Sequence, residues 1–104
     1  MIGDASVAGA MPKAGHAANN QGKLVATAVV RMLAGFDPVE PLITSTCYSL
    51  VTPEHGVSIT GVFEVNETGV MTMVEGAGGV SPVGAPQEAR KREALYTKAW
   101  YAGI

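Results

Sequence analysis

A glycine and two prolines divide the sequence into two unlike parts. Gly35 suits the end of a helix, and Pro38 and Pro41 prevent a helix from continuing. Before this break, mainly apolar side chains recur at spacings of three and four, which predicts a helix from about Gly15 to Ala34. Its predicted inward stripe is Gln21, Leu24, Val25, Ala28 and Met32. We therefore expect an α+β protein with a boundary between residues 37 and 38.

The second part predicts a small three-stranded antiparallel sheet followed by a C-terminal helix. Val57 to Val65 alternates apolar and polar residues, as in a half-buried strand. Asn66 to Gly69 is typical of a hairpin turn. The other predicted segments are strands over 43–51 and 70–74, an irregular loop over 76–85, and a helix from Pro86 to about Tyr101. On that helix we expect one apolar face formed by Ala89, Leu95, Tyr96, Ala99 and Trp100.

The first 13 residues predict a strand stub and a loop. In Ile2-Gly3-Asp4-Ala5, the glycine permits close approach of a ligand, and the carboxylate can accept hydrogen bonds from sugar-type hydroxyls. The helix that follows offers a positive N-terminal dipole to such a ligand. Because this motif stands at residue 1, we expect the chain to be the C-terminal piece of a larger protein.

Several ordered motifs resemble those of known flavoproteins. Residues 2–6, 10–13 and 15–19 resemble the second flavin-binding motif of flavoproteins with two dinucleotide-binding domains. Later segments resemble the flavoprotein subunit of flavocytochrome c sulfide dehydrogenase. They are Thr46-Cys47-Tyr48-Ser49-Leu50, the segment from Glu75 to Pro82, the segment from Arg90 to Tyr96, and Trp100-Tyr101.

The resemblance implies two domains and a flavin site in the parent protein. Residues 1–37 would be the C-terminal remnant of an FAD-binding domain, and residues 38–104 the C-terminal domain of this subunit. FAD would lie against Gly3, Asp4, Met11, Pro12 and Lys13. Asp4 would be hydrogen-bonded to the ribityl chain, and residues 11–13 would lie near the isoalloxazine. This chain alone is expected not to hold FAD, because half of the site is missing.

Cys47 and Trp100 are the residues for which the resemblance implies redox roles. Taken alone, a single cysteine in a strand is usually a small buried hydrophobic residue, and a helix aromatic is usually part of a core. The resemblance implies instead that Cys47 is half of a redox disulfide beside the flavin, with its partner in an upstream domain. Trp100 would lie near the electron path to a c-type cytochrome subunit.

Composition excludes several other classes of function. The net charge of −2 gives no reason to expect a nucleic-acid partner, and no apolar run approaches the ~20 residues of a membrane span. His16 and His55 lie far apart without a completing ligand, so no metal site is expected. Only 15% of the residues are charged, against a usual ~25%. Either a partner or missing domains cover the surface, which predicts self-association of this chain, or the sequence is simply poor in charge.

Three functions remain open at this point. The first is the C-terminal part of a periplasmic sulfide dehydrogenase that uses FAD and passes electrons to a c-type cytochrome. The second is a non-catalytic covering domain that docks a cytochrome or another subunit. The third is a related oxidoreductase of the flavoprotein disulfide reductase type, including forms that reduce a quinone. The first predicts that this chain alone is colourless and does not turn over sulfide.

Overall fold

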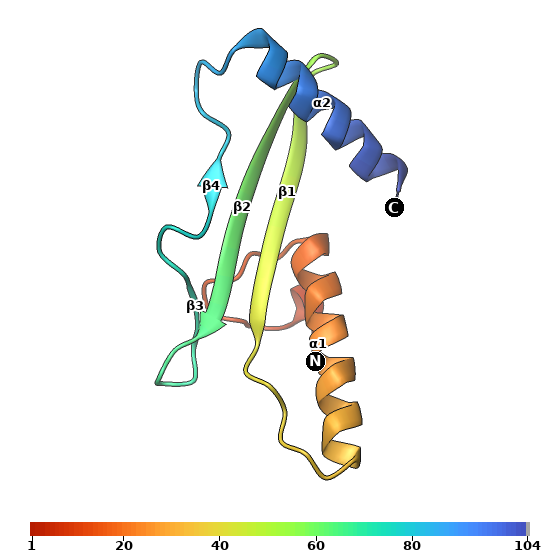
Figure 1. Cartoon of the computed structure of the whole chain (residues 1–104), viewed down its shortest axis with the longest axis vertical. Helices are drawn as coiled ribbons and strands as arrows, with labels where there is room; N and C mark the ends of the chain where they lie inside the picture. Colours follow the sequence, from red (N-terminus) through yellow and green to blue (C-terminus); the bar gives the residue numbers. More distant parts are fainter. Residues whose placement is uncertain (104) are drawn as a thin grey trace.

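The protein is an elongated hairpin flanked by two helices. The computed structural model describes residues 1–103, with extents of 52 × 29 × 21 Å. Its radius of gyration of 16.2 Å exceeds the ~13 Å expected for a compact domain of about 100 residues. As Figure 1 shows, helix α1 lies beside one half of the hairpin, and helix α2 crosses its other end. Each helix therefore covers only part of the sheet.

Two long antiparallel strands form the centre of the sheet. Strand β1 (Leu42–Thr52) pairs with β2 (His55–Val65), so that Ile43 faces Phe63 and Cys47 faces Ile59. Strands β3 (Met71–Met73) and β4 (Gly79–Val80) pair with successive parts of the other edge of β2. The expected α+β class is confirmed. The predicted three-stranded sheet gains a fourth strand, because two residues of the predicted loop reach β2.

Helix α1 (Gly15–Leu33) begins and ends close to the predicted positions. Its end is a Schellman motif, in which Phe36 N–H donates to the Arg31 carbonyl at 2.9 Å and Gly35 N–H to the Met32 carbonyl at 3.1 Å. Gly35 has a φ of +83°, a conformation that favours glycine. The predicted helix stop at Gly35 is thus confirmed by its backbone geometry.

The predicted strand stub at the N-terminus is wrong. Residues Gly3–Ala5 form a short 3₁₀ helix, η1, and Gly3 has a φ of +72°, outside the extended region. The Gly3 N–H donates to Oε1 of Gln21 on α1, so a helix side chain satisfies the group that a strand would pair. Within residues 1–103, no strand pairs with this segment. Without such a neighbour the extended form gains no ladder hydrogen bonds.

The small core joins residues from both sides of the break at residues 35–41. Met11 and Ala17 are buried together with Ile43 of β1 and Phe63 of β2. The Ala10 N–H also donates to the Met71 carbonyl at 3.0 Å, which ties the N-terminal loop to β3. The two sequence ranges 1–37 and 38–104 therefore share one core, and their assignment to two domains stays a prediction.

Helix α2 (Gln87–Ala102) uses a different face from the predicted one. Ala94 and Thr97 are buried, whereas Leu95 is 66% exposed and Tyr96 and Trp100 are also exposed. The helix can lie close because β2 carries Gly56 beneath it, where an added Cβ would run into the backbone of Glu93 and Ala94. Small residues, rather than large apolar ones, therefore form the closest contact between α2 and β2.

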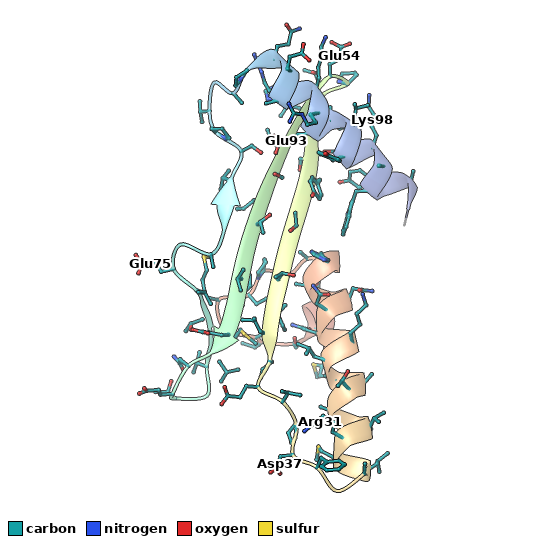
Figure 2. All side chains as sticks on the ribbon, viewed as in Figure 1. Arg31, Asp37, Glu54, Glu75, Glu93 and Lys98 are labelled. Carbon is teal, nitrogen blue, oxygen red and sulfur yellow. The ribbon has the colours of Figure 1, made fainter. Side chains whose placement is uncertain are left out.

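A polar cluster fixes the same helix to β2 and to the loop before it. Oε1 of Glu93 accepts hydrogen bonds from the hydroxyls of Ser58 at 2.8 Å and Ser81 at 2.6 Å. Ser81 Oγ in turn accepts the Ser58 N–H at 2.7 Å. Figure 2 shows Glu93 on the side of α2 that meets the strands. Three elements thus converge on one carboxylate.

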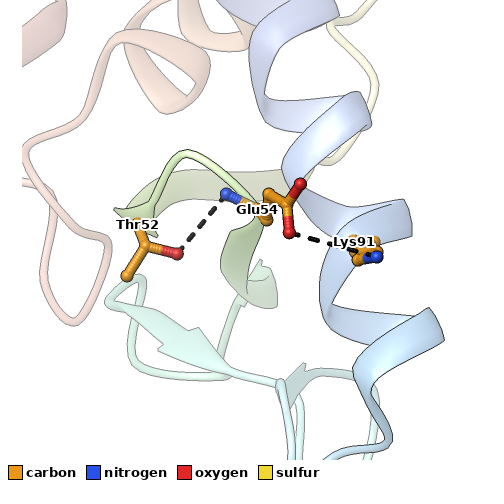
Figure 3. A network of polar contacts seen from close by, with 3 residues as sticks. All are labelled: Thr52, Glu54 and Lys91. Carbon is orange, nitrogen blue, oxygen red and sulfur yellow. Dashed lines mark hydrogen bonds and ion pairs between the residues drawn. The ribbon is translucent and has the colours of Figure 1, made fainter.

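The hairpin tip adds a weaker link to α2. Glu54 Oε2 lies 4.0 Å from Lys91 Nζ, and the Glu54 N–H reaches Thr52 Oγ1 at 3.4 Å (Figure 3). Both charged side chains are well exposed. An ion pair of this kind contributes little, because water screens it and two long side chains must be ordered.

The outer side of α1 exposes large apolar side chains. Leu33 is 85% exposed, and Val25 and Met32 of the predicted stripe are also exposed, so only Gln21, Leu24 and Ala28 of that stripe are partly buried. The further exposed apolar residues of this surface are Val29, Val30 and Phe36.

No helix in residues 1–103 combines the length and apolarity needed to cross a bilayer.

Candidate functional site

Cys47 lies in the middle of β1 and is partly buried. It is a free thiol in this chain, which contains one cysteine. Because side chains alternate along a strand, Ser45 shares its face, whereas Thr46 and Tyr48 lie on the other. The Cys47 side chain therefore lies on the same face of the hairpin as Ser45, and the residues directly before and after it lie on the opposite face.

One cavity of about 360 Å³ lies along β1 and β2 and includes Cys47 in its lining. Pro12 lines it from the N-terminal loop, and Gly76, Gly78 and Gly79 line it from the segment that includes β4. A Cβ at Gly78 would meet the Thr60 carbonyl, so glycine allows this loop to approach the strand. The result is a mainly apolar cavity with the Cys47 thiol in its lining.

Ser45 supplies an unpaired polar group at this cavity. The residue is 3% exposed, and its Oγ has no hydrogen-bond partner among the described residues. It lines the same cavity as Cys47 and Pro12. Because leaving a buried hydroxyl unpaired costs free energy, about 1–3 kcal/mol, this oxygen favours a ligand that offers a polar atom.

A second cavity of about 590 Å³ lies toward the ends of both helices. His16 lines it from α1, Tyr48 from β1, and Trp100 and Tyr101 from α2. Cys47 lines it too, and it is the one residue shared by the linings of these two cavities. Neither lining contains Asp, Glu, Lys or Arg from the described part of the chain.

The N-terminal site residues gather around a third, smaller recess of about 80 Å³. Gly3, Pro12 and Lys13 line it together with Met11. Lys13 Nζ donates to the backbone carbonyl of Asp4 at 2.7 Å, which holds the loop across η1. The side chain of Met11 is also buried in the core, whereas Asp4 is exposed and does not line the recess.

Most of the predicted site residues therefore lie in cavity linings that share a residue. Pro12 lines both the small recess and the 360 Å³ cavity, and Cys47 lines both that cavity and the 590 Å³ cavity that Trp100 also lines. Within residues 1–103 there is no group of three or more His, Cys, Asp or Glu side chains that could hold a metal ion.

Sequence reasoning missed Ser45, His16 and the glycine loop as parts of the site. Ser45 could have been found, because it stands two residues before Cys47 and therefore on the same face of the strand. Residues 76–79 were expected to be only a connecting loop, yet three of them line the cavity. Nothing in the local sequence shows that this loop returns to β2.

The architecture is that of a small α+β module with a thiol between two cavities, one of them apolar with a buried polar group. Residues 39–104, more than half of the chain, match the family described as flavocytochrome c sulphide dehydrogenase, flavin-binding. The chain therefore belongs to this family. The expected resemblance to the flavoprotein subunit is confirmed by this match.

Proposed function

We propose that this chain supplies one side of the flavin site in a flavin-dependent sulfide dehydrogenase. In this proposal it is the C-terminal part of a longer flavoprotein, which works in the periplasm and delivers electrons to a c-type cytochrome subunit. The observation that carries the proposal is the place of Cys47, between the cavity lined by Pro12 and the cavity lined by Trp100.

The residues of the first cavity fit a flavin ring. Its lining is mainly apolar, its glycines allow backbone to approach a flat ligand, and the unpaired Ser45 hydroxyl offers a hydrogen bond to a ring heteroatom. Gly3 and Asp4 would hold the ribityl chain, and Pro12 and Lys13 would lie near the ring. When bound, FAD supplies an acceptor that takes two electrons and releases them one at a time.

Cys47 would act as one half of a disulfide with a cysteine outside this chain. Hydrosulfide attacks one sulfur of that disulfide, a new S–S bond forms, and the old one breaks. One cysteine then carries a persulfide, and the other leaves as a thiolate that holds the electron pair. The absence of charged side chains from the described lining keeps this chemistry in an apolar environment.

Trp100 would lie between this thiol and the cytochrome. It lines the second cavity with Cys47, and it is partly exposed, so one side of the ring is available to a partner. Its contacts with the rings of His16 and Tyr48 hold it beside β1. These positions support a path from the thiol side of the sheet to the outer surface.

The proposal is tested by Cys47→Ser in the flavoprotein assembled with its cytochrome. We expect the flavin absorbance to be retained and sulfide-dependent reduction of the cytochrome to fall to background. Ser49→Ala is the matched control, because Ser49 is exposed on the same strand. Turnover of the Cys47→Ser protein at the normal rate would contradict the proposal, whereas a loss in both variants would indicate a general defect of β1.

A second function, docking of a cytochrome or another subunit, is favoured by the outer face of α2. Leu95 and Tyr96 are exposed large apolar side chains on the helix that also carries Trp100. Exposed apolar groups of this kind are typical of interaction surfaces. If docking is the whole function, Leu95→Glu weakens complex formation while Cys47→Ser leaves turnover intact.

A further inference from the structure

Besides its contact with the Trp100 ring, His16 makes a hydrogen bond to β1 to which neither the family match nor the proposed function assigns a role. It is the second residue of α1 and lines the larger cavity with Cys47, Tyr48 and Trp100. Over the described residues, no Cα atom of α1 lies within 8 Å of a Cα atom of α2. The two helices therefore meet through side chains, and His16 is one of the side chains that reach across.

The imidazole accepts a hydrogen bond from one backbone N–H group on the outer edge of β1. Nδ1 of His16 accepts the Thr46 N–H at 2.8 Å. One helical turn later, the Asn20 side-chain amide donates to the Thr44 carbonyl at 2.7 Å. His16 and Asn20, four residues apart, lie on one face of α1, and Thr46 and Thr44, two residues apart, lie on the edge of β1 that this face meets. Because β1 is an edge strand, these side chains take the place of a neighbouring strand.

The same edge continues into contacts with α2. The Tyr101 hydroxyl donates to the Tyr48 carbonyl at 3.2 Å, which lies two residues further along β1 than Thr46. The Trp100 ring lies against the rings of both His16 and Tyr48, with centroid distances of 5.1 and 5.6 Å. Its plane makes an angle of 80° with the imidazole, the edge-to-face arrangement favoured by aromatic pairs.

The two contacts of His16 use different parts of its side chain. Nδ1 accepts the Thr46 N–H, and Nε2 lies 3.4 Å from Nδ2 of Asn20. The ring therefore serves two purposes with different atoms: its nitrogen holds the strand, and its ring contacts the indole.

We propose that His16 is a positioning residue that couples the segment carrying Cys47 to Trp100. Its nitrogen fixes the backbone of Thr46, the residue directly before the thiol, and its ring fixes the indole. The assignment of a redox purpose to this coupling rests on the proposed function, but the coupling itself belongs to this chain and is measurable without flavin.

Two substitutions separate the two contacts. His16→Asn keeps an acceptor oxygen near the position of Nδ1 but removes the ring. His16→Phe keeps a ring but removes the acceptor. His55→Asn is the matched control, because His55 lies at the start of β2, away from this cavity. The chain has one tryptophan and one cysteine, so fluorescence excited selectively at tryptophan reports on Trp100 alone and alkylation on Cys47 alone.

For His16→Phe we expect faster hydrogen exchange at the Thr46 amide and faster alkylation of Cys47 by iodoacetamide, each by roughly two- to tenfold, the range for one hydrogen bond. The Trp100 emission maximum should stay near its normal position. For His16→Asn we expect Thr46 exchange close to normal and a shifted Trp100 emission. His55→Asn should change none of these quantities.

Unchanged exchange at Thr46 in His16→Phe overturns the inference, as does an unshifted Trp100 emission in His16→Asn. An equal rise in exchange along the whole of β1 in both variants also overturns it, because His16 would then be only a general structural residue. These outcomes leave the proposed function untouched, since that is decided by Cys47→Ser in the assembled protein.

Discussion

Gly56 sets how closely α2 can lie on the sheet, and Gly56→Ala tests this directly. A Cβ at Gly56 would meet the amide nitrogen of Ala94 and the carbonyl of Glu93. Both are backbone atoms, so no side-chain rotation can relieve the clash. The helix has to move as a body, or β2 has to bend away from it.

The size of the effect follows from this geometry. Overpacking of a close contact costs about 1–3 kcal/mol. For a domain of about 100 residues, each kcal/mol lowers Tm by about 4–8 °C, so we expect a loss of at least about 4 °C. Because Trp100 lies on the displaced helix, its emission should change in the folded state as well.

Thermal unfolding followed by circular dichroism, together with Trp100 emission at low temperature, measures both effects. Gly79→Ala is the matched control, because Gly79 also lies in a strand paired to β2 but has no heavy atom within 4 Å of an added Cβ. We expect that control to stay within about 0.5 kcal/mol of the parent chain. Equal Tm values for Gly56→Ala and Gly79→Ala, with unchanged emission, would refute the placement of α2 over Gly56.

Three further predictions concern other contacts. Glu93→Ala should lower the free energy of unfolding in urea by about 1.5–3 kcal/mol, because two hydroxyls lose a charged acceptor, and Glu93→Gln by less; equal losses would contradict this. Lys91→Ala should lower the free energy of unfolding by less than about 1 kcal/mol in the same assay, because its ion pair with Glu54 is exposed. A larger loss would contradict this. Leu33→Glu should reduce concentration-dependent self-association measured by sedimentation velocity, and a parent chain that stays monomeric at high concentration contradicts the expected association.

The positions of the helices and long strands could be predicted because local signals agree with the fold. The Schellman end at Gly35 and the hairpin turn, where Asn66 Oδ1 accepts the N–H groups of Thr68 and Val70, are both set by residues close in sequence. The inward face of α2 could not be predicted from large apolar residues. It depends on Gly56, a residue more than thirty positions away whose missing side chain makes the contact possible.

The site was predictable only in part for a similar reason. Cys47, Pro12 and Trp100 were named from motifs, and the structure places each of them at a cavity. The role of the intervening groups depends on contacts between distant segments. His16 reaches Thr46, thirty positions away, and the loop at Gly78 reaches Thr60, so no periodicity within either segment could show it.

The shared core has a consequence for how this protein would respond to cleavage. Residues 35–40 are exposed, and they connect α1 to β1 without entering the core. Met11 and Ala17 on one side remain buried against Ile43 and Phe63 on the other. A protease that nicks this connection would therefore leave two fragments held together by the same apolar contacts, able to separate only when the whole assembly unfolds.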